Sequence, residues 1–248
     1  VLGANYFLVH STNVRATANF ARHMEQILLI DTSADTCTVG LVRDAELVQA
    51  LQHEERQSQA AVINPLIEQL CKETNIQLAD LNAIAVCSGP GSYTGLRIGM
   101  AAAKGLAYAL NKPLILHHKL ELLAQQLMRV NDDFWQYAVL IGARPGEFFY
   151  AAYDAEMNII HQPVHGTTET IKSLIDELSV TSACLTGDQQ AGEVFGERVL
   201  IVPQIDCSLW AGWAARSLAL QHFADVAAAV PFYMKEVFIC QPKDKSEK

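Results

Sequence analysis

The order of apolar runs and turn residues along the chain constrains its fold more than any single motif. Short β-rich runs at 27–30, 36–42 and 45–52 come first, separated by turn-rich stretches, and they predict a strand meander. Helical and strand-like segments then alternate, and a comparable succession begins again after residue 136. Strands that alternate with helices are typical of α/β folds. The repetition therefore predicts two α/β lobes.

The first half of the chain contains two predicted helices on either side of a buried strand at 81–87. The earlier helix, at 58–74, includes Pro65, which is expected to kink it or to mark its first turn. The later helix, at 92–110, follows a glycine-rich loop. The apolar residues that recur at helical spacing in the earlier helix are Val62, Ile63, Leu66, Ile67 and Leu70.

The second half sets the predicted domain limits. Its elements are a strand at 114–116, a helix at 119–130, a strand pair at 137–141 and 148–153, a helix at 168–178, a strand at 183–186 and a helix at 208–223. We place the N-terminal lobe at 24–116 and the C-terminal lobe at 117–240, with a charged tail at 241–248. Residues 1–23 have neither acids nor a periodic apolar face, and we interpret them as a leader that is disordered or was added by cloning or upstream translation.

Charge and composition exclude several classes of protein. The net charge is −9, and residues 24–248 carry −11 because the first 23 residues contribute two arginines and no acid. Nucleic-acid binding depends on Lys and Arg that neutralise phosphates, so we expect RNA to be bound only through a basic partner. No run of about 18 apolar residues predicts a membrane span, and we expect a cytoplasmic protein. Six cysteines without a CxxC pair indicate free buried thiols rather than a zinc or redox site.

The most specific motif is the segment 88–99, which reads Ser-Gly-Pro-Gly-Ser-Tyr-Thr-Gly-Leu-Arg-Ile-Gly. Glycines at a strand-to-helix junction permit positive φ and close backbone approach, and the free N–H groups at a helix start can hold an anion. Ser92 or Thr94 is expected to cap the helix. The alternative is a tight turn that binds no ligand. The spacing matches neither of the common phosphate-binding glycine motifs.

Asp31 closes the first predicted strand, where a carboxylate could help to hold a metal–nucleotide complex. The alternative is a turn residue that accepts hydrogen bonds from the backbone of Thr32 and Ser33. Together with the glycine loop, this turn forms a candidate nucleotide or anion site. Its residues are Asp31, Ser33, Gly89, Gly91 and Ser92.

Small residues form a stripe along the helix at 92–110, since Gly95, Gly99 and Ala103 are four residues apart. Each glycine inside a helix costs roughly 1 kcal/mol, which only close packing against another element offsets. That element is either the chain's own sheet or a helix of another chain. The second alternative predicts an interface that contains Val62, Ile63, Leu66, Leu70, Gly95, Gly99, Ala102 and Ala103.

The spacing of the histidines predicts no metal site. His117 and His118 are adjacent, so their side chains diverge. His161 and His165 are four residues apart, but Pro163 between them argues against a helix. A helical zinc pair needs both histidines on one face of a helix. The chain also lacks a GxSxG nucleophile elbow.

Four segments, in their order and spacing, resemble the TsaB (YeaZ) family. They lie at 27–33, 88–99, 141–147 and 231–235, and the resemblance covers about residues 25–240. The glycine loop is its most specific part. The resemblance implies an actin-like ATPase (ASKHA) fold of two ribonuclease-H-like lobes. It also implies a bacterial subunit that is needed for threonylcarbamoyladenosine formation in tRNA.

The resemblance implies partners as well. A catalytic paralogue, TsaD, would bind the helices at 58–74 and 92–110 in a heterodimer, an ATPase, TsaE, would join the assembly, and the isolated chain could form a homodimer. TsaD holds its metal partly with two histidines four residues apart, whereas this chain has His118 and then Leu122. Gly142 stands where similar proteins commonly carry Asp. Both departures predict a vestigial nucleotide site and no catalytic residue, metal or cofactor of the chain's own.

Three functions are compatible with these observations. The first is a non-catalytic partner subunit that supports a TsaD-like catalytic subunit, with ATP and metal handled by the partners. The second is a nucleotide-dependent enzyme of the same fold, an ATPase or small-molecule kinase, which keeps Asp31 but lacks an evident base. The third is a peptidase, because similar proteins were once described as glycoproteases, and the missing histidine pair weakens it most. ATP turnover with and without the paralogue distinguishes the first two.

Overall fold

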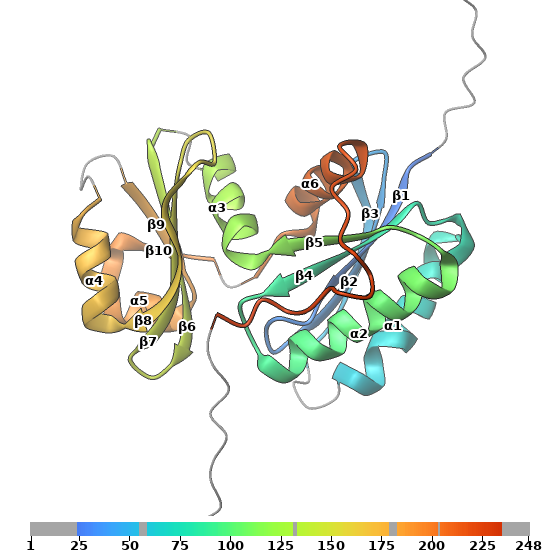
Figure 1. Ribbon diagram of the computed structural model, residues 1–248, viewed down its shortest axis with the longest axis horizontal. Coiled ribbons are helices and arrows are strands. Elements are labelled where there is room, and N and C mark those ends of the chain that lie inside the picture. Colours follow the sequence, from blue (N-terminus) through green and yellow to red (C-terminus); the bar gives the residue numbers. More distant parts are fainter. Residues whose placement is uncertain (1–23, 55–58, 131–132, 179–182, 203, 235–248) are drawn as a thin grey trace, which may run out of the picture.

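The computed structural model describes residues 24–54, 59–130, 133–178, 183–202 and 204–234, which form two β-sheets flanked by helices (Figure 1). Residues 1–23, interpreted from the sequence as a leader, and residues 241–248, interpreted as a charged tail, lie outside the described residues. None of the described helices has both the length and the apolar character that crossing a membrane requires.

The first half of the chain builds one five-stranded sheet. Its elements are β1 (Gln26–Asp31), β2 (Cys37–Arg43), β3 (Glu46–His53), α1 (Gln59–Thr74), a short 3-10 helix (Leu78–Asp80), β4 (Ala83–Gly89), α2 (Tyr93–Leu110), β5 (Leu114–His118) and α3 (Lys119–Val130). Strands β1 to β3 form the expected antiparallel meander, and β4 and β5 join it in parallel. The strand order is β3-β2-β1-β4-β5.

The second half repeats this topology. Its elements are β6 (Gln136–Arg144), β7 (Glu147–Asp154), β8 (Ile159–Thr167), α4 (Thr168–Asp176), β9 (Ala183–Gly187), α5 (Gln189–Phe195), a 3-10 turn (Gly196–Arg198), β10 (Val199–Ile201) and α6 (Cys207–Ala219). The strand order β10-β9-β6-β7-β8 is that of the first sheet, so the predicted repetition is confirmed. The sequence patterns missed β8, α5 and β10. Strand β8 contains Pro163 and little apolar alternation, and the other two elements are short.

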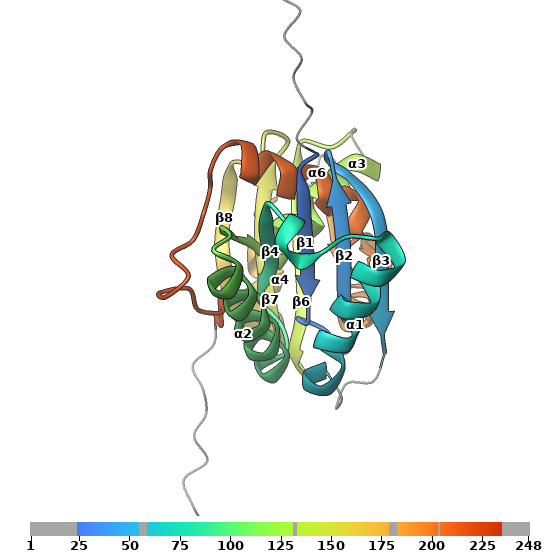
Figure 2. The ribbon, with the colours of Figure 1, turned by 90° about the vertical axis from the view of Figure 1, so that its right-hand side faces the viewer.

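Three apolar cores divide the molecule into layers. Helices α1 and α2 lie side by side on the outer face of the first sheet (Figure 2). Helices α4 and α5 cover the outer face of the second sheet, and α3 and α6 lie between the two sheets. Strand β1 shows the alternation that this arrangement needs, because Leu28 and Ile30 join the α1–α2 core while Ile27 and Leu29 join the central core.

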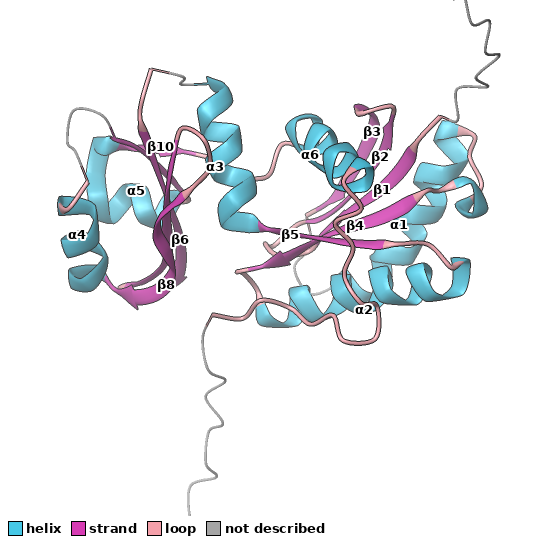
Figure 3. Cartoon of the chain, turned by 45° about the horizontal axis from the view of Figure 1, so that its top comes forward, coloured by secondary structure: helices cyan, strands magenta, loops and turns pink. Residues whose placement is uncertain are grey.

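Each half ends in a helix that crosses to the other sheet. Helix α3 follows β5 but packs mainly against β6 and β7, and α6 follows β10 but packs against β1 and β3. Figure 3 shows α6 and α2 on opposite faces of the first sheet. The prediction that residues 117–240 form the second lobe is therefore wrong at its C-terminal end. Residues 207–234 belong with the first sheet, whose inner apolar face requires a cover.

Candidate functional site

The turn after β1 is fixed by hydrogen bonds within the chain. Asp31 Oδ1 accepts the N–H of Ser33 at 2.8 Å, which is the turn role that the sequence left as an alternative. Gln59 of α1, which is buried, donates from Nε2 to the carbonyl oxygens of Ala34 and Thr36 at 2.9 and 3.2 Å. These bonds anchor the turn on α1.

The glycine loop packs directly against this turn. Ser92 N–H donates to the carbonyl oxygen of Ser33 at 2.8 Å, and Thr32 Oγ1 donates to the carbonyl oxygen of Gly95 at 2.7 Å. A Cβ atom on Gly91 would lie 2.1 Å from the Ser33 carbonyl oxygen, and one on Gly95 would lie 2.1 Å from that of Thr32. The glycines therefore permit a close backbone approach between two turns of the same chain.

Helix α2 begins with one of the two expected caps. Ser92 Oγ accepts the N–H of Gly95 at 3.2 Å, so Ser92 rather than Thr94 is the N-cap residue. Gly89 adopts a φ of 113°, a value that favours glycine at this position. Gly89 and Asp31 thus shape the two turns, and neither residue lines the cleft between the two sheets.

The small-residue stripe faces the chain's own core. Gly95, Gly99 and Ala103 are buried, and a Cβ atom on Gly99 would lie 2.2 Å from Thr32 Oγ1. The prediction that these three residues contact a partner is therefore wrong. The small size of these residues allows α2 to pack closely against the β1–β2 turn and the first sheet.

Two further residues of the predicted interface are also internal. Ile63 is 2% exposed and Leu70 is fully buried, and both belong to the core beneath α1 and α2. Of the eight residues predicted for this surface, Val62, Leu66 and Ala102 are partly exposed and lie at its edge. Of these eight residues, a partner that covers α1 and α2 can contact only Val62, Leu66 and Ala102.

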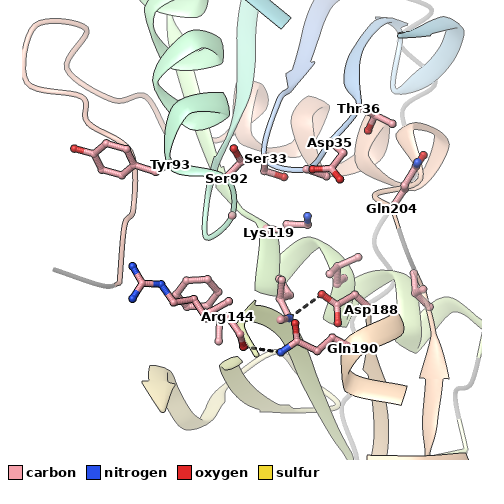
Figure 4. Close-up of a pocket in the computed structure, with 18 of the residues that line it drawn as sticks. Ser33, Asp35, Thr36, Ser92, Tyr93, Lys119, Arg144, Asp188, Gln190 and Gln204 are labelled. Atoms are coloured by element: carbon pink, nitrogen blue, oxygen red, sulfur yellow. Dashed lines mark hydrogen bonds between the residues drawn. The ribbon is translucent and has the colours of Figure 1, made fainter. Parts of the chain in front are cut away.

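A cleft of about 760 Å³ opens between the two sheets (Figure 4). From the first half it is lined by the β1–β2 turn, the start of α2 and the start of α3. From the second half it is lined by the end of β6 and the start of α5. The side chains that supply polar or charged groups include Ser33, Asp35, Ser92, Lys119, Arg144, Asp188 and Gln190. Of the predicted site residues, Ser33, Gly91 and Ser92 lie here.

Asp188 places a carboxylate beside Gly142, the position at which similar proteins commonly carry an aspartate. Gly142 N–H donates to Asp188 Oδ2 at 2.7 Å, and Asp188 Oδ1 accepts the N–H of Ala191 at 3.1 Å as the N-cap of α5. A Cβ atom on Gly142 would lie 2.5 Å from Gln190 Oε1, so a larger residue would displace Gln190. The sequence signal for Asp188 is its place directly after the strand that ends at Gly187.

Sequence reasoning also missed Lys119, the first residue of α3. A lysine at the start of an amphipathic helix carries no local sign of burial, yet this one is 5% exposed. Its amino group points into the cleft beneath Ser33 and Ser92 (Figure 4).

The histidines take structural positions. The side chains of His117 and His118 diverge as predicted, and His118 Nδ1 lies 3.2 Å from Ser88 Oγ. His161 and His165 both lie in strand β8, so their spacing is not helical. Within the described part of the chain, no three His, Cys, Asp or Glu side chains are grouped to hold a metal ion.

The described cysteines with placed side chains are free thiols, namely Cys37, Cys71, Cys87 and Cys207. Burial, together with the nearby charge of Asp31, raises the pKa of Cys37 to about 11 and that of Cys207 to about 12. Such thiols stay protonated near neutral pH and are poor nucleophiles. The side chains of Cys184 and Cys240 lie outside the described residues.

Comparison with known proteins assigns the chain to a family. A family model described as TsaD: tRNA N6-adenosine threonylcarbamoyltransferase matches residues 52–230. The chain belongs to this family. It is 34% identical to the tRNA threonylcarbamoyladenosine biosynthesis protein TsaB of Escherichia coli K12 over 133 residues, which cover 54% of the chain and 57% of that protein.

Two other relatives extend the comparison to TsaD and to a solved structure. The tRNA N6-adenosine threonylcarbamoyltransferase of Wolbachia pipientis wMel is 31% identical, over 48% of the chain and 40% of that protein. The chain thus spans about half the length of the curated relatives it matches. The structure of YeaZ from Pseudomonas aeruginosa is 25% identical, with a TM-score of 0.68, and covers 85% of this chain and 100% of that one. The expected TsaB/YeaZ resemblance and the actin-like ATPase fold with two ribonuclease-H-like lobes are confirmed.

Proposed function

We propose that this chain is a non-catalytic subunit that binds and supports a TsaD-like catalytic subunit in the threonylcarbamoylation of adenosine in tRNA. Membership of the TsaB/YeaZ and TsaD family supports the pathway, and the relatives named TsaB support the role of a biosynthesis subunit. The observation that carries the non-catalytic role is Leu122. This residue stands four positions after His118, where the resemblance calls for a second metal-binding histidine, and it is a buried part of the central core.

The proposal divides the work among several proteins. This chain requires no cofactor, and ATP and metal are handled by the TsaD-like subunit and by a TsaE-like ATPase. In the cytoplasm, tRNA meets this chain only through the complex. In the absence of its partner the chain forms a homodimer through the surface that otherwise binds the TsaD-like subunit.

We place the partner surface on the solvent side of α1 and α2. Val62, Leu66 and Ala102 are partly exposed there, and each packs at the edge of the core that the two helices share. A surface with an apolar centre of this kind suits a protein partner, because the buried centre of a protein–protein interface is more apolar than its polar rim.

Capture of the paralogue tests the proposal. The chain is co-expressed with the TsaD-like protein of the same source, as wild type and as Ala102→Arg. We expect the wild type to capture the paralogue and the variant to lose at least about tenfold in affinity, because a buried unpaired charge opposes association. Ala219→Arg is the matched control, since Ala219 is exposed at the end of α6, on the other side of the first sheet.

ATP turnover tests the non-catalytic part. We expect the isolated chain to hydrolyse ATP at background rates, far below the roughly 1 per second of ordinary enzymes. Addition of the paralogue should be necessary for tRNA modification. Turnover in the ordinary range by the isolated chain, or failure of the folded wild type to capture the paralogue, would overturn the proposal.

A further inference from the structure

Helix α2 carries positive charge on a chain that is acidic as a whole. Its 18 residues include Arg97 and Lys104 but no Asp or Glu, whereas residues 24–248 carry a net charge of −11. With 3.6 residues per turn, Tyr93, Arg97 and Lys104 lie within an arc of about 40° around the helix axis. One face of α2 therefore combines an aromatic ring with two cations.

Three planar groups stack at the N-terminal end of this face. The Arg97 guanidinium carbon lies 4.5 Å from the centroid of the Tyr93 ring, and the ring centroids of Tyr93 and Tyr233 are 4.8 Å apart. Arg97 Nε donates to Tyr233 Oη at 3.1 Å, which orients the guanidinium plane. The Tyr93 ring is directed away from Lys119 and the interior of the cleft (Figure 4). Tyr93 is 37% exposed and Arg97 is also exposed, so the stack is open to solvent.

The C-terminal segment that ends beside the stack is held in place by other contacts. Residues 224–234 run along α2 (Figure 2), where Lys104 Nζ donates to the carbonyl oxygen of Ala229 at 2.8 Å. Phe232 N–H donates to the carbonyl oxygen of Ser88 at 2.8 Å. A cation–π contact at an exposed site adds little to stability. Anchoring of this segment therefore does not account for three solvent-facing planar groups at one point.

The stack lies on a different side of α2 from the proposed partner surface. Ala102 follows Tyr93 by nine residues, or about two and a half turns, and so lies on the opposite side of the helix. Val62 and Leu66 of α1 pack at the edge of the same core as Ala102. A partner can cover these three residues and leave Tyr93 and Arg97 open to solvent.

We propose that the stack of Tyr93, Arg97 and Tyr233 binds an unpaired RNA base, which in the complex belongs to the tRNA substrate. Unpaired bases are recognised by stacking on aromatic rings and on guanidinium planes. The absence of acids from α2 lets the phosphates beside that base approach Arg97 and Lys104. A single stacked base adds little affinity by itself, which agrees with an acidic chain that meets tRNA only in the complex. The inference rests on the proposed function, because the complex supplies the tRNA.

Steady-state tRNA modification by the reconstituted complex of the full chain, the TsaD-like paralogue and the TsaE-like ATPase tests the stack. Tyr93→Leu keeps apolar bulk but loses the aromatic face, and Arg97→Lys keeps the charge but loses the plane. We expect either variant to raise KM for tRNA about fivefold or more with kcat nearly unchanged, because the contribution of one stacked base is of this size. The matched control is Tyr108→Leu, since Tyr108 is 84% exposed and lies about 22 Å further along α2.

The remaining outcomes separate this inference from the proposed function. A wild-type complex that does not form, or that modifies no tRNA, overturns the proposed function and the inference with it. If the wild type is active, KM values for Tyr93→Leu and Arg97→Lys that equal that of Tyr108→Leu overturn the inference alone. Loss of paralogue capture by a variant that melts like the wild type shows a protein contact in place of a base, and it also overturns the inference. If one variant melts much earlier, the other decides, and if both do, the stack serves stability and the inference is wrong.

Discussion

Gly99 and Gly105 lie in the same helix but have opposite surroundings. A Cβ atom on Gly99 would lie 2.2 Å from Thr32 Oγ1, whereas nothing lies within 4 Å of one on Gly105. We expect Gly99→Ala to lower the free energy of unfolding by about 1–3 kcal/mol, because Thr32 must move. Gly105→Ala should raise it by about 0.5–1 kcal/mol through helix propensity. Chemical denaturation of both variants measures this contrast, and equal effects would contradict the close approach of α2 to the β1–β2 turn.

The close contact between Gly99 and Thr32 makes Gly99 unsuitable for a variant that tests the interface. Gly99→Arg would place a long cation against Thr32, which is fully buried. Such a variant would misfold, and its loss of partner binding would carry no information about the interface. Ala102, which is partly exposed on the same helix, is the better position.

His117 makes the stability of the chain depend on pH. Trp210 Nε1–H donates to His117 Nδ1 at 2.9 Å, and His117 Nε2 lies 3.0 Å from Ser217 Oγ. Burial, with a smaller contribution from the charge of His118, lowers the pKa of His117 to about 4. An unfolded histidine has a pKa near 6.5, so the unfolded state takes up the proton first as the pH falls. The free energy of unfolding should therefore drop between about pH 6.5 and pH 4, by at most about 3 kcal/mol.

The control for this prediction is a histidine at the surface. Unfolding is measured at about pH 7, 6 and 5 for the wild type, His117→Gln and His222→Gln, of which His222 is exposed. We expect a flatter dependence on pH only in His117→Gln. The same slope in all three proteins would show that His117 does not exclude the proton in the folded chain.

At the scale of elements, α6 stabilises a sheet that lies far from it in sequence. Its Trp210 is 1% exposed and shares the central core with Ile27 and Leu29 of β1. We expect a fragment of residues 24–118, close to the lobe that the sequence predicts, not to fold, because the inner face of its sheet would be exposed to water. Fusion of this fragment to residues 204–234 should restore a cooperative thermal transition.

Circular dichroism during heating distinguishes the two fragments. Besides α6, residues 204–234 include a segment that contacts the first half directly. Ala224 N–H donates to Leu114 O at 2.8 Å, and Lys104 Nζ donates to Ala229 O at 2.8 Å. Cooperative melting of the 24–118 fragment without residues 204–234 would contradict the role of α6 as a cover.

At the scale of the whole molecule, charge governs the encounter with tRNA. Residues 24–248 carry a net charge of −11, and affinity for nucleic acid rests mainly on neutralised phosphates. We expect the isolated chain to bind tRNA with a dissociation constant weaker than about 10 µM near physiological salt. Filter binding at low and physiological salt measures it, with the paralogue complex as the positive control. Tight and strongly salt-dependent binding by the isolated chain would show that it binds tRNA without its partner.

Local patterns in the sequence determined much of the fold. The meander at the start of the chain, the helices α1 and α2 and the repetition in the second half follow from apolar periodicity and turn residues, which act over a few neighbours. The glycine loop and the N-cap at Ser92 could be predicted for the same reason, because both depend on residues that are adjacent in sequence. Strand β8, which carries Pro163, and the three-residue strand β10 were missed because neither presents a local pattern strong enough to recognise.

Only the tertiary structure decided what these elements approach. The glycine stripe was compatible with an internal or an external neighbour, and the position of Thr32 made it internal. Lys119 and Asp188 line one cleft because two sheets from different halves of the chain face each other across it. Helix α6 returns to the first sheet for a related reason, since the apolar inner face of that sheet has to be covered. These contacts join residues that are far apart in sequence, and the free energy that selects them comes from a shared core rather than from local propensity.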